Sequence, residues 1–109
     1  MKKVAVIQSV YKNDKPEYLK LSIDSILNQT FKNFVLFLGI DGPIGNDVRE
    51  VIESVNDARL CVIENKENKG IASILNDLLA ECRKQGYEYI ARMDSDDISK
   101  PERLEKQIA

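Results

Sequence analysis

Residues 34–40 read Phe-Val-Leu-Phe-Leu-Gly-Ile, and the turn signal Asp41-Gly42 follows them directly. A short, unbroken apolar run that ends at a turn is typical of a strand buried on both faces, since a half-buried strand alternates apolar and polar side chains. Strands of this kind occur mainly in parallel sheets that helices cover on both sides. The stretch therefore predicts an α/β fold built on a parallel sheet.

The same strand pattern recurs along the chain and alternates with helical patterns. Short apolar segments predict further strands at residues 3–9, 60–64 and 87–93. Apolar residues at helical spacing predict helices at residues 16–29, 48–55 and 71–86, and a fourth helix that Pro101 opens. A strand followed by a helix, four times over, predicts parallel strands joined by right-handed crossovers, with helices on both faces of the sheet.

The composition indicates one packed domain. A chain of 109 residues favours a single domain over residues 1–109, and 43% hydrophobic with 31% charged residues is typical of a globular core with a polar surface. The 18 acidic and 16 basic residues give a net charge of -2, so nothing in the charge favours nucleic acid as a partner. The sequence has no stretch of membrane-spanning length, and we expect a cytoplasmic location.

Two further features bear on what the chain can do by itself. It has no histidine, so acid–base or metal chemistry must use carboxylates, Lys, Tyr or Cys. Its last residues, Ile108-Ala109, fall inside a helical pattern that no cap or polar tail closes. We therefore expect the chain to be a truncated part of a longer protein.

Polar residues follow each predicted strand. They are Tyr11-Lys12-Asn13, Asp41-Gly42, Asn68-Lys69-Gly70 and Asp94-Ser95-Asp96-Asp97. In an open parallel sheet the carboxyl ends of the strands meet at one edge, and ligands bind there. We therefore expect these four groups to form one site.

The acidic cluster at residues 94–97 has the most specific chemistry. Closely spaced carboxylates bind a hard divalent cation such as Mg²⁺ or Mn²⁺ through oxygen. The alternative is a solvated acidic turn in which Asp97 or Ser99 caps the next helix. Its place after a buried strand, beside three other polar groups, favours a metal site, with Ser99 as the helix cap before Pro101.

The other groups keep two interpretations each. Asp41 can accept a hydrogen bond from a ring N–H such as that of uracil, or it can be the first residue of an ordinary turn. Main-chain N–H groups at residues 68–70, with the charge of Lys69, favour an anion, or the segment is a loop in which Gly70 supplies an unusual backbone conformation. Tyr11 can stack on a base or cover the sheet edge.

Four segments carry a resemblance to a known family. They are VAVIQSVYKND (4–14), LKLSIDSILNQTFKNFVLFLGIDGP (19–43), NKGIASILNDLL (68–79) and YIARMDSDDISKPERLEKQ (89–107). Together they resemble the nucleotide-binding half of family 2 glycosyltransferases, inverting enzymes of the GT-A fold. The resemblance covers essentially all of the chain, and its specificity comes from SIDSILNQTFKNF together with MDSDDISKPERL, since an Asp-x-Asp alone would be weak.

The resemblance implies a fold and a set of site residues. The fold is a Rossmann-like, GT-A type three-layer sandwich with about four mostly parallel strands in the order 3-2-1-4. The implied nucleotide-binding residues are Tyr11, Asp41, Lys69 and Asp94, and the implied ligands of Mn²⁺ or Mg²⁺ are Asp96 and Asp94. It assigns no role to Asp97. The family often has two acidic residues where this chain has Ile40-Asp41, so the first carboxylate is missing here.

The resemblance also implies a reaction. A nucleotide-diphosphate sugar, with uridine diphosphate favoured, would donate its glycosyl group with inversion to a saccharide or lipid-linked acceptor in polysaccharide or glycolipid biosynthesis. Such enzymes work in the cytoplasm or at the inner face of the membrane, and their general base lies beyond the stretch that these residues match. The alternative is a nucleotidyltransferase-like domain, but that class has a basic, Gly-rich loop after its first strand, and residues 10–18 contain no glycine.

Overall fold

The computed structural model of the chain describes residues 4–95 and 98–108. The strands in these residues are β1 (Val4–Val10), β2 (Phe34–Asp41), β3 (Leu60–Asn65) and β4 (Tyr89–Met93). The helices are α1 (Pro16–Leu27), α2 (Asn46–Glu53), α3 (Ile71–Lys84) and α4 (Arg103–Ile108). Strands and helices alternate along the chain as the apolar pattern predicts.

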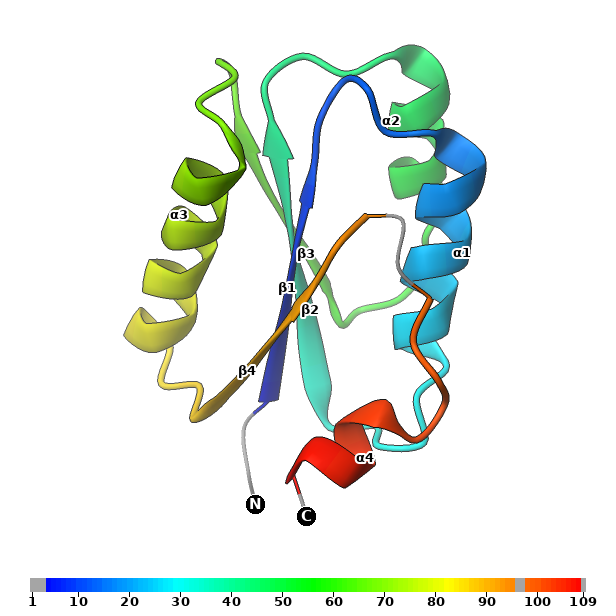
Figure 1. Cartoon of the computed structure of the whole chain (residues 1–109), viewed down its shortest axis with the longest axis vertical. Helices are drawn as coiled ribbons and strands as arrows, with labels where there is room; N and C mark the ends of the chain where they lie inside the picture. The colour runs from blue at the N-terminus through cyan, green and yellow to red at the C-terminus, as the bar shows by residue number, and fades with distance from the viewer. Residues whose placement is uncertain (1–3, 96–97, 109) are drawn as a thin grey trace.

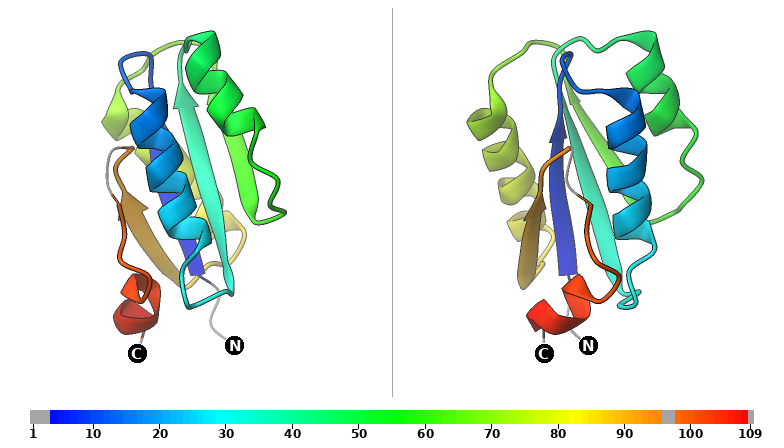
Figure 2. Two further views of the ribbon diagram at one scale, coloured as in Figure 1. Left: turned by 90° about the vertical axis from the view of Figure 1, so that its right-hand side faces the viewer. Right: turned by 45° about the vertical axis from the view of Figure 1, so that its right-hand side comes forward.

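The strands form one parallel sheet in the order β3-β2-β1-β4, which confirms the expected order. Helix α3 covers one face of this sheet, and α1 and α2 cover the other (Figure 1). Two further views show the same three layers, and α4 lies at the end of the sheet that also holds the N-terminus of the chain (Figure 2). The crossovers leave the loops that follow the strands together at the opposite end of the sheet.

Strand β2 shows why its sequence decides the fold. Successive side chains of a strand point to opposite faces, and both faces of β2 are covered. One set packs against α1 and α2: Phe34, Leu36, Leu38 and Ile40. Phe37 packs on the α3 side instead. Gly39 also faces α3, and a Cβ there would lie 2.7 Å from Cγ1 of Ile74, so the missing side chain allows α3 to approach the sheet.

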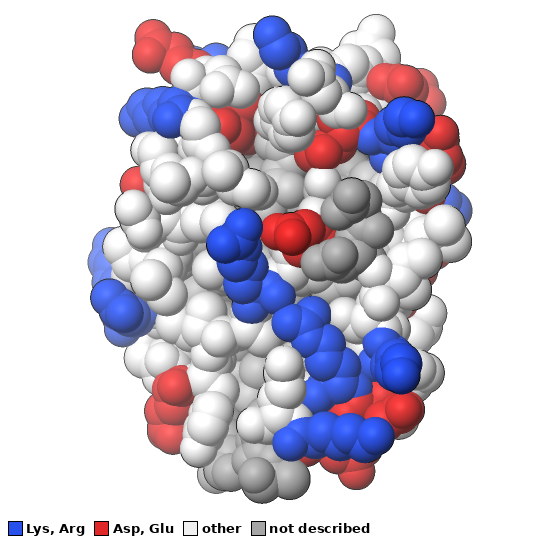
Figure 3. All heavy atoms as spheres, in the orientation of Figure 1, with Lys and Arg blue, Asp and Glu red and all other residues white. Residues whose placement is uncertain are grey.

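Charged side chains are unevenly spread over the face seen in Figure 1. Acidic and basic side chains are mixed along the edge where β1 and β2 end, and a band of basic side chains runs from the centre of this face toward α4 (Figure 3). The basic residues that line the hollows around β4 and α4 are Arg92, Lys100, Arg103 and Lys106. No helix among the described residues is long and apolar enough to cross a membrane.

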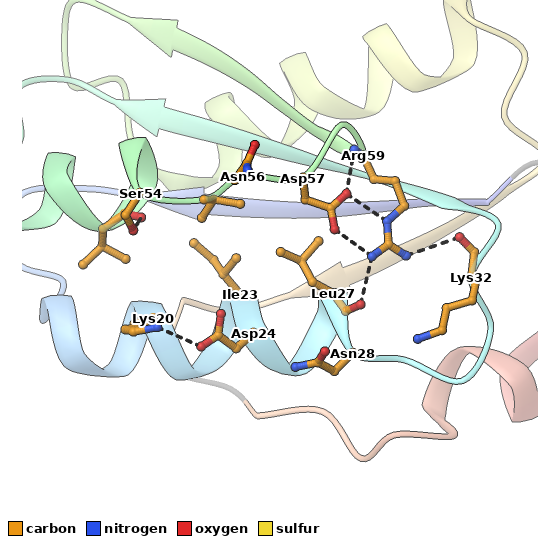
Figure 4. A pocket seen from close by; sticks show the side chains of 12 residues that line it. Lys20, Ile23, Asp24, Leu27, Asn28, Lys32, Ser54, Asn56, Asp57 and Arg59 are labelled. Carbon is orange, nitrogen blue, oxygen red and sulfur yellow. Dashed lines mark hydrogen bonds and ion pairs between the residues drawn. The ribbon is translucent and has the colours of Figure 1, made fainter.

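Arg59 joins three segments at the other end of the sheet (Figure 4). Its Nε donates to Oδ1 of Asp57 at 3.0 Å, and its Nη2 donates to Oδ2 of Asp57 at 2.8 Å and to the carbonyl of Leu27 at 2.9 Å. Its guanidinium lies 4.5 Å from the centre of the Phe34 ring. Arg59 thereby fastens the end of α1 and the start of β2 to the turn before β3.

We expect Arg59→Met to lower the free energy of unfolding by about 2 kcal/mol, because it removes charge-assisted hydrogen bonds and leaves the Leu27 carbonyl without this donor. Arg83→Met, on the exposed last turn of α3, removes the same group away from this cluster and should stay within about 0.5 kcal/mol of wild type. Urea denaturation at neutral pH measures both variants. Equal midpoints for the two would contradict this role of Arg59.

The same pair adds a pH dependence. Hydrogen bonds from Arg59 lower the pKa of Asp57 from 3.8 to about 2. Because the folded pKa lies below the unfolded one, the contribution of the pair is complete above about pH 4 and is lost as the pH falls through the folded value. The stability difference between wild type and Asp57→Asn should therefore shrink as the pH falls over this range, and a difference that stays constant would exclude the ion pair as its source.

Candidate functional site

A cleft of about 460 Å³ lies where the strands end. Its lining comes from four separate parts of the sequence: Ser9, Val10, Tyr11, Asp14, Asp41, Asn68, Gly70, Ile71, Ile74, Arg92, Asp94 and Ser95. These residues lie at the carboxyl ends of β1, β2 and β4, in the segments that follow β1, β3 and β4, or in the first turn of α3. The expectation that the polar groups after the strands meet at one edge is therefore met by the fold.

Asp41, the last residue of β2, is only 3% exposed. Its Oδ1 accepts a hydrogen bond from the main-chain N–H of Lys69 at 2.8 Å, and its Oδ2 accepts one from that of Gly70 at 3.0 Å. Gly70 has a φ of 94°, which favours glycine. The two N–H groups that the sequence suggested for a bound anion thus hold the carboxylate of Asp41, and Lys69 keeps its own side chain exposed.

The turn after β1 forms another wall of the cleft. The Oδ2 of Asp14 accepts a hydrogen bond from the N–H of Tyr11 at 2.9 Å, which closes the turn. The Oδ1 of Asp14 accepts one from the hydroxyl of Ser95 at 2.7 Å. Tyr11 is 42% exposed at the rim of the cleft. Asp14, which lies outside the predicted polar groups, and Ser95, which belongs to the group predicted after the fourth strand, therefore connect this turn to the segment after β4.

Asp94 is the described member of the acidic cluster. It lines the cleft, and its Oδ1 lies 3.3 Å from Nη2 of Arg92. Asp96 and Asp97 lie outside the described residues, so the metal-ligand role expected of Asp96 stays a prediction. Within the described ranges no group of three His, Cys, Asp or Glu side chains is placed to hold a metal ion.

The carboxylates of the cleft nevertheless suit a hard divalent cation. Mg²⁺ is usually held by one or two carboxylates together with the phosphates of a substrate, so a dedicated cage of protein ligands is not required. Asp94 and Asp14 both line the cleft and supply oxygen, the ligand type such ions prefer. The donor set therefore fits Mn²⁺ or Mg²⁺ bound together with a phosphate ligand.

Buried polar side chains attach Asp94 to the core. The Nε2 of Gln8, in β1, donates to the hydroxyl of Ser22 at 2.7 Å and to the main-chain carbonyl of Asp94 at 3.2 Å. The hydroxyl of Ser22, in α1, also donates to this carbonyl at 3.2 Å. Gln8 and Ser22 are both fully buried. The main chain of Asp94 is therefore fixed from β1 and α1 together.

The same face of α1 also forms hydrogen bonds with residues 99 and 100, which come after Asp94 in the sequence. Ser22, Ser25 and Gln29, which we call the polar stripe, lie at helical spacing, with Gln29 just past the end of α1. The hydroxyl of Ser25 accepts a hydrogen bond from the N–H of Ser99 at 3.0 Å. Gln29 donates from Nε2 to the carbonyl of Lys100 at 2.7 Å. The polar stripe therefore holds the chain on both sides of residues 96–97.

The last helix is capped differently from the prediction. The predicted helix starts at Pro101 with Ser99 as its cap, whereas α4 starts at Arg103. Oε1 of Gln29 accepts the N–H of Leu104 at 3.0 Å, so a side chain from another element satisfies the first turn of α4. The hydroxyl of Ser99 instead accepts a hydrogen bond from Nη1 of Arg103 at 3.0 Å. The prediction for Ser99 was wrong because sequence patterns for helix caps include only residues next to the helix, whereas Gln29 comes from a distant part of the sequence.

A signal for the polar stripe is present in the sequence. Leu19, Ile23 and Ile26 form the buried face of α1. Ser22 lies three residues after Leu19 and four before Ile26, and Gln29 lies three after Ile26, so both polar residues fall inside the apolar face. A polar residue inside an apolar face must find a partner when it is buried. That pattern could have identified the stripe, although not what it binds.

Comparison with known proteins identifies relatives of the whole chain. The model of the family described as Glycosyl transferase family 2 matches residues 6–109. The chain is 48% identical over 93 residues to the bifunctional glycosyltransferase pgtA of Dictyostelium discoideum, which covers 83% of this chain and 12% of that protein. It is 40% identical over 110 residues to the putative glycosyltransferase EpsE of Bacillus subtilis, covering 98% of this chain and 37% of the other.

A third relative is the O-antigen biosynthesis glycosyltransferase WbnJ of Escherichia coli, 38% identical over 108 residues, which cover 95% of this chain and 39% of WbnJ. Residues 1–109 thus correspond to only a part of each of these relatives, between 12 and 39% of their length.

Solved structures share the fold. Staphylococcus aureus TarS 1–349 in complex with UDP superposes with a TM-score of 0.79 over 99% of this chain and 31% of that one, at 23% identity. The mannosyltransferase PcManGT from Pyrobaculum calidifontis, in complex with GDP-Man and Mn²⁺, superposes with a TM-score of 0.68 over 87% of this chain and 28% of that one, also at 23% identity. At this level of identity the likeness concerns the fold alone.

The polar stripe is open to a direct test through Gln29. Gln29→Leu leaves the N–H of Leu104 and the carbonyl of Lys100 without this partner in a buried place, and we expect a loss of about 2–4 kcal/mol of stability. Gln85→Leu makes the same chemical change at the exposed end of α3 and should cost at most about 0.5 kcal/mol. Urea denaturation gives both values, and hydrogen exchange at Leu104 reports the lost cap. Unchanged protection of that amide in Gln29→Leu would contradict the cap.

Proposed function

The chain belongs to glycosyl transferase family 2, and from this membership we propose that residues 1–109 form a single nucleotide-sugar-binding domain, the donor half of a longer glycosyltransferase. The observation that carries the proposal is the cleft at the carboxyl ends of the strands, with Tyr11, Asp41 and Asp94 in its lining. In open α/β sheets this is the edge at which ligands bind. The cleft volume also falls within the range of about 300–1,000 Å³ that small-molecule sites occupy.

The donor we propose is a nucleoside diphosphate sugar, with uridine diphosphate favoured. TarS in complex with UDP, which shares the fold, supports this choice of nucleotide, and PcManGT shows that the fold also accepts GDP-Man. Tyr11 lies at the rim, where its exposed ring can stack on a base. Each oxygen of Asp41 accepts one main-chain N–H, and a carboxylate oxygen can accept a second donor such as a ring N–H.

Asp94, with Asp96, would hold Mn²⁺ or Mg²⁺ in this proposal, as the oxygen ligands and the Mn²⁺ in the PcManGT complex support. Such a cation, when bound, neutralises the charge of the diphosphate leaving group. The residues of this chain position the proposed metal ligand. Gln8 and Ser22 donate hydrogen bonds to the main-chain carbonyl of Asp94, which fixes the main chain that carries its carboxylate. Lys69, exposed beside Asp41, is the proposed outer contact of the nucleotide.

The glycosyl transfer itself needs further residues. An inverting displacement requires a general base to take the proton of the acceptor hydroxyl. Asp41 is held by main-chain N–H groups and Asp14 by Tyr11 and Ser95, so neither is poised for that task. We therefore propose that the base lies in the part of the longer protein that this chain does not include. We propose a saccharide or lipid-linked acceptor, reached in the cytoplasm or at the inner face of the membrane, and the name of WbnJ, an O-antigen biosynthesis glycosyltransferase, supports its saccharide character.

Asp94→Asn tests the proposal. It keeps the size of the side chain and removes one negative charge from the cleft, so Mn²⁺-dependent binding of UDP should weaken by about tenfold or more, the change expected for one hydrogen-bonded charge. Asp24→Asn, on the exposed side of α1 beside Lys20, removes the same charge outside the cleft and should bind UDP as wild type does. Titration calorimetry with and without Mn²⁺ measures both. Wild-type protein that binds no UDP in the presence of Mn²⁺ would refute the proposed function.

A further inference from the structure

One basic side chain, that of Arg92, is found among the described residues that line the cleft. Three carboxylates line it as well: Asp14, Asp41 and Asp94. A diphosphate that enters this space meets negative charge on several sides and would be repelled. Lys12 and Lys69 carry positive charge on the neighbouring loops, but neither lines the cleft. Among the described residues that line the cleft, the guanidinium of Arg92 therefore supplies the positive charge of the protein.

Two of the three carboxylates already have donors from the protein. Asp41 is buried and accepts hydrogen bonds from the main-chain N–H groups of Lys69 and Gly70. Asp14 accepts hydrogen bonds from Tyr11 and Ser95. The guanidinium of Arg92 lies beside the third carboxylate, that of Asp94.

The position of Arg92 follows from the strand. Ile90, two residues earlier on β4, packs with the hydrophobic cluster on the α3 side of the sheet, and residues two apart on a strand share a face. Arg92 therefore lies on the α3 side, as does Ile74 on the floor of the cleft. The backbone carbonyl of Arg92 accepts a hydrogen bond from Nη2 of Arg103 at 2.7 Å, which holds this part of β4 from outside.

The guanidinium of Arg92 holds its partner weakly. Its Nη2 lies 3.3 Å from Oδ1 of Asp94, and the two side chains are 57% and 52% exposed. Ion pairs that are this exposed contribute little to stability, because water screens them. The guanidinium can therefore exchange Asp94 for another anion at small cost.

We propose that Arg92 binds the diphosphate of the donor, turning from Asp94 to the phosphate oxygens when the nucleotide enters. This inference rests on the proposed function and adds a donor-binding residue to it. A guanidinium has five N–H donors in a planar fork that matches phosphate oxygens, and the contact with Asp94 uses one of its nitrogens. The carboxylate of Asp94 can then face the divalent cation while Arg92 faces the phosphate oxygens.

The simpler alternative is that Arg92 is only a counter-ion of Asp94. The two roles predict opposite effects of removing the guanidinium. A counter-ion competes with a cation for Asp94, so its loss should leave UDP binding equal or stronger. The loss of a phosphate-binding residue should weaken the binding of UDP, whereas the affinity for Mn²⁺ alone should not fall.

Arg92→Gln separates the two roles. In the presence of Mn²⁺ its affinity for UDP should fall about tenfold, as expected for one lost charge-assisted hydrogen bond. Its affinity for UMP should fall less, and that for uridine should not change, because these probes carry fewer phosphate oxygens. Arg92→Lys, which keeps the charge but not the planar fork, should bind UDP with intermediate affinity. The control is Arg83→Gln, which removes the same charge on the last turn of α3 and should bind UDP like wild type.

Titration calorimetry of UDP, UMP, uridine and Mn²⁺ alone measures all of these values. Arg92→Gln with the UDP affinity of Arg83→Gln, or with equal losses for UDP and uridine, would overturn the inference. It would leave the proposed function standing, since wild type would still bind UDP in the presence of Mn²⁺ and Asp94→Asn would still bind it more weakly. Should Arg92→Gln fail to fold, a UDP affinity of Arg92→Lys equal to that of wild type would overturn the inference in its place.

Discussion

The hydrogen bonds that run from β1 and α1 to the main chain around residues 94–104 are the constraint on which the cleft depends. They are made in the interior: Gln8, Ser22 and Gln29 are all fully buried. A buried polar group that loses its partner costs more than the hydrogen bond itself contributed, so alternative placements of this segment are disfavoured. The position of Asp94 is therefore decided by residues more than seventy positions away in the sequence.

The cleft is also organised electrostatically without any ligand. The loop before α3 bonds to Asp41, the turn after β1 bonds to Asp14, and Arg92 faces Asp94. Carboxylates that face one another would otherwise repel, and each of these three has an internal donor that limits the cost. Such donors keep the oxygen-rich lining in place, which is the form in which a cation and a phosphate can be bound together.

The fold could be predicted from the sequence because its signal is local. Short strand-like segments alternate with helical patterns along the chain, and a parallel sheet places the strand ends together whatever the loops contain. The place of Asp94 and Tyr11 at this edge could be predicted for the same reason. The donors of Asp41 and the role of Ser99 were not, because both depend on which loop of the folded chain comes nearest. The polar stripe had a local signal inside the apolar face of α1, but its partners lie on a segment that no pattern connects to it.

In the proposed function, a divalent cation and a nucleoside diphosphate bind together in the cleft at the strand ends. Paramagnetic broadening of amide NMR signals by Mn²⁺ in the presence of UDP is the sharpest test, because broadening falls off steeply with distance from the ion. We expect the amides of Tyr11, Asp14, Asp94 and Ser95 to broaden first, while those of α2 and of the turn at Asp57 stay sharp. Broadening centred on α2 or on the turn at Asp57, or none that depends on UDP, would contradict this proposal.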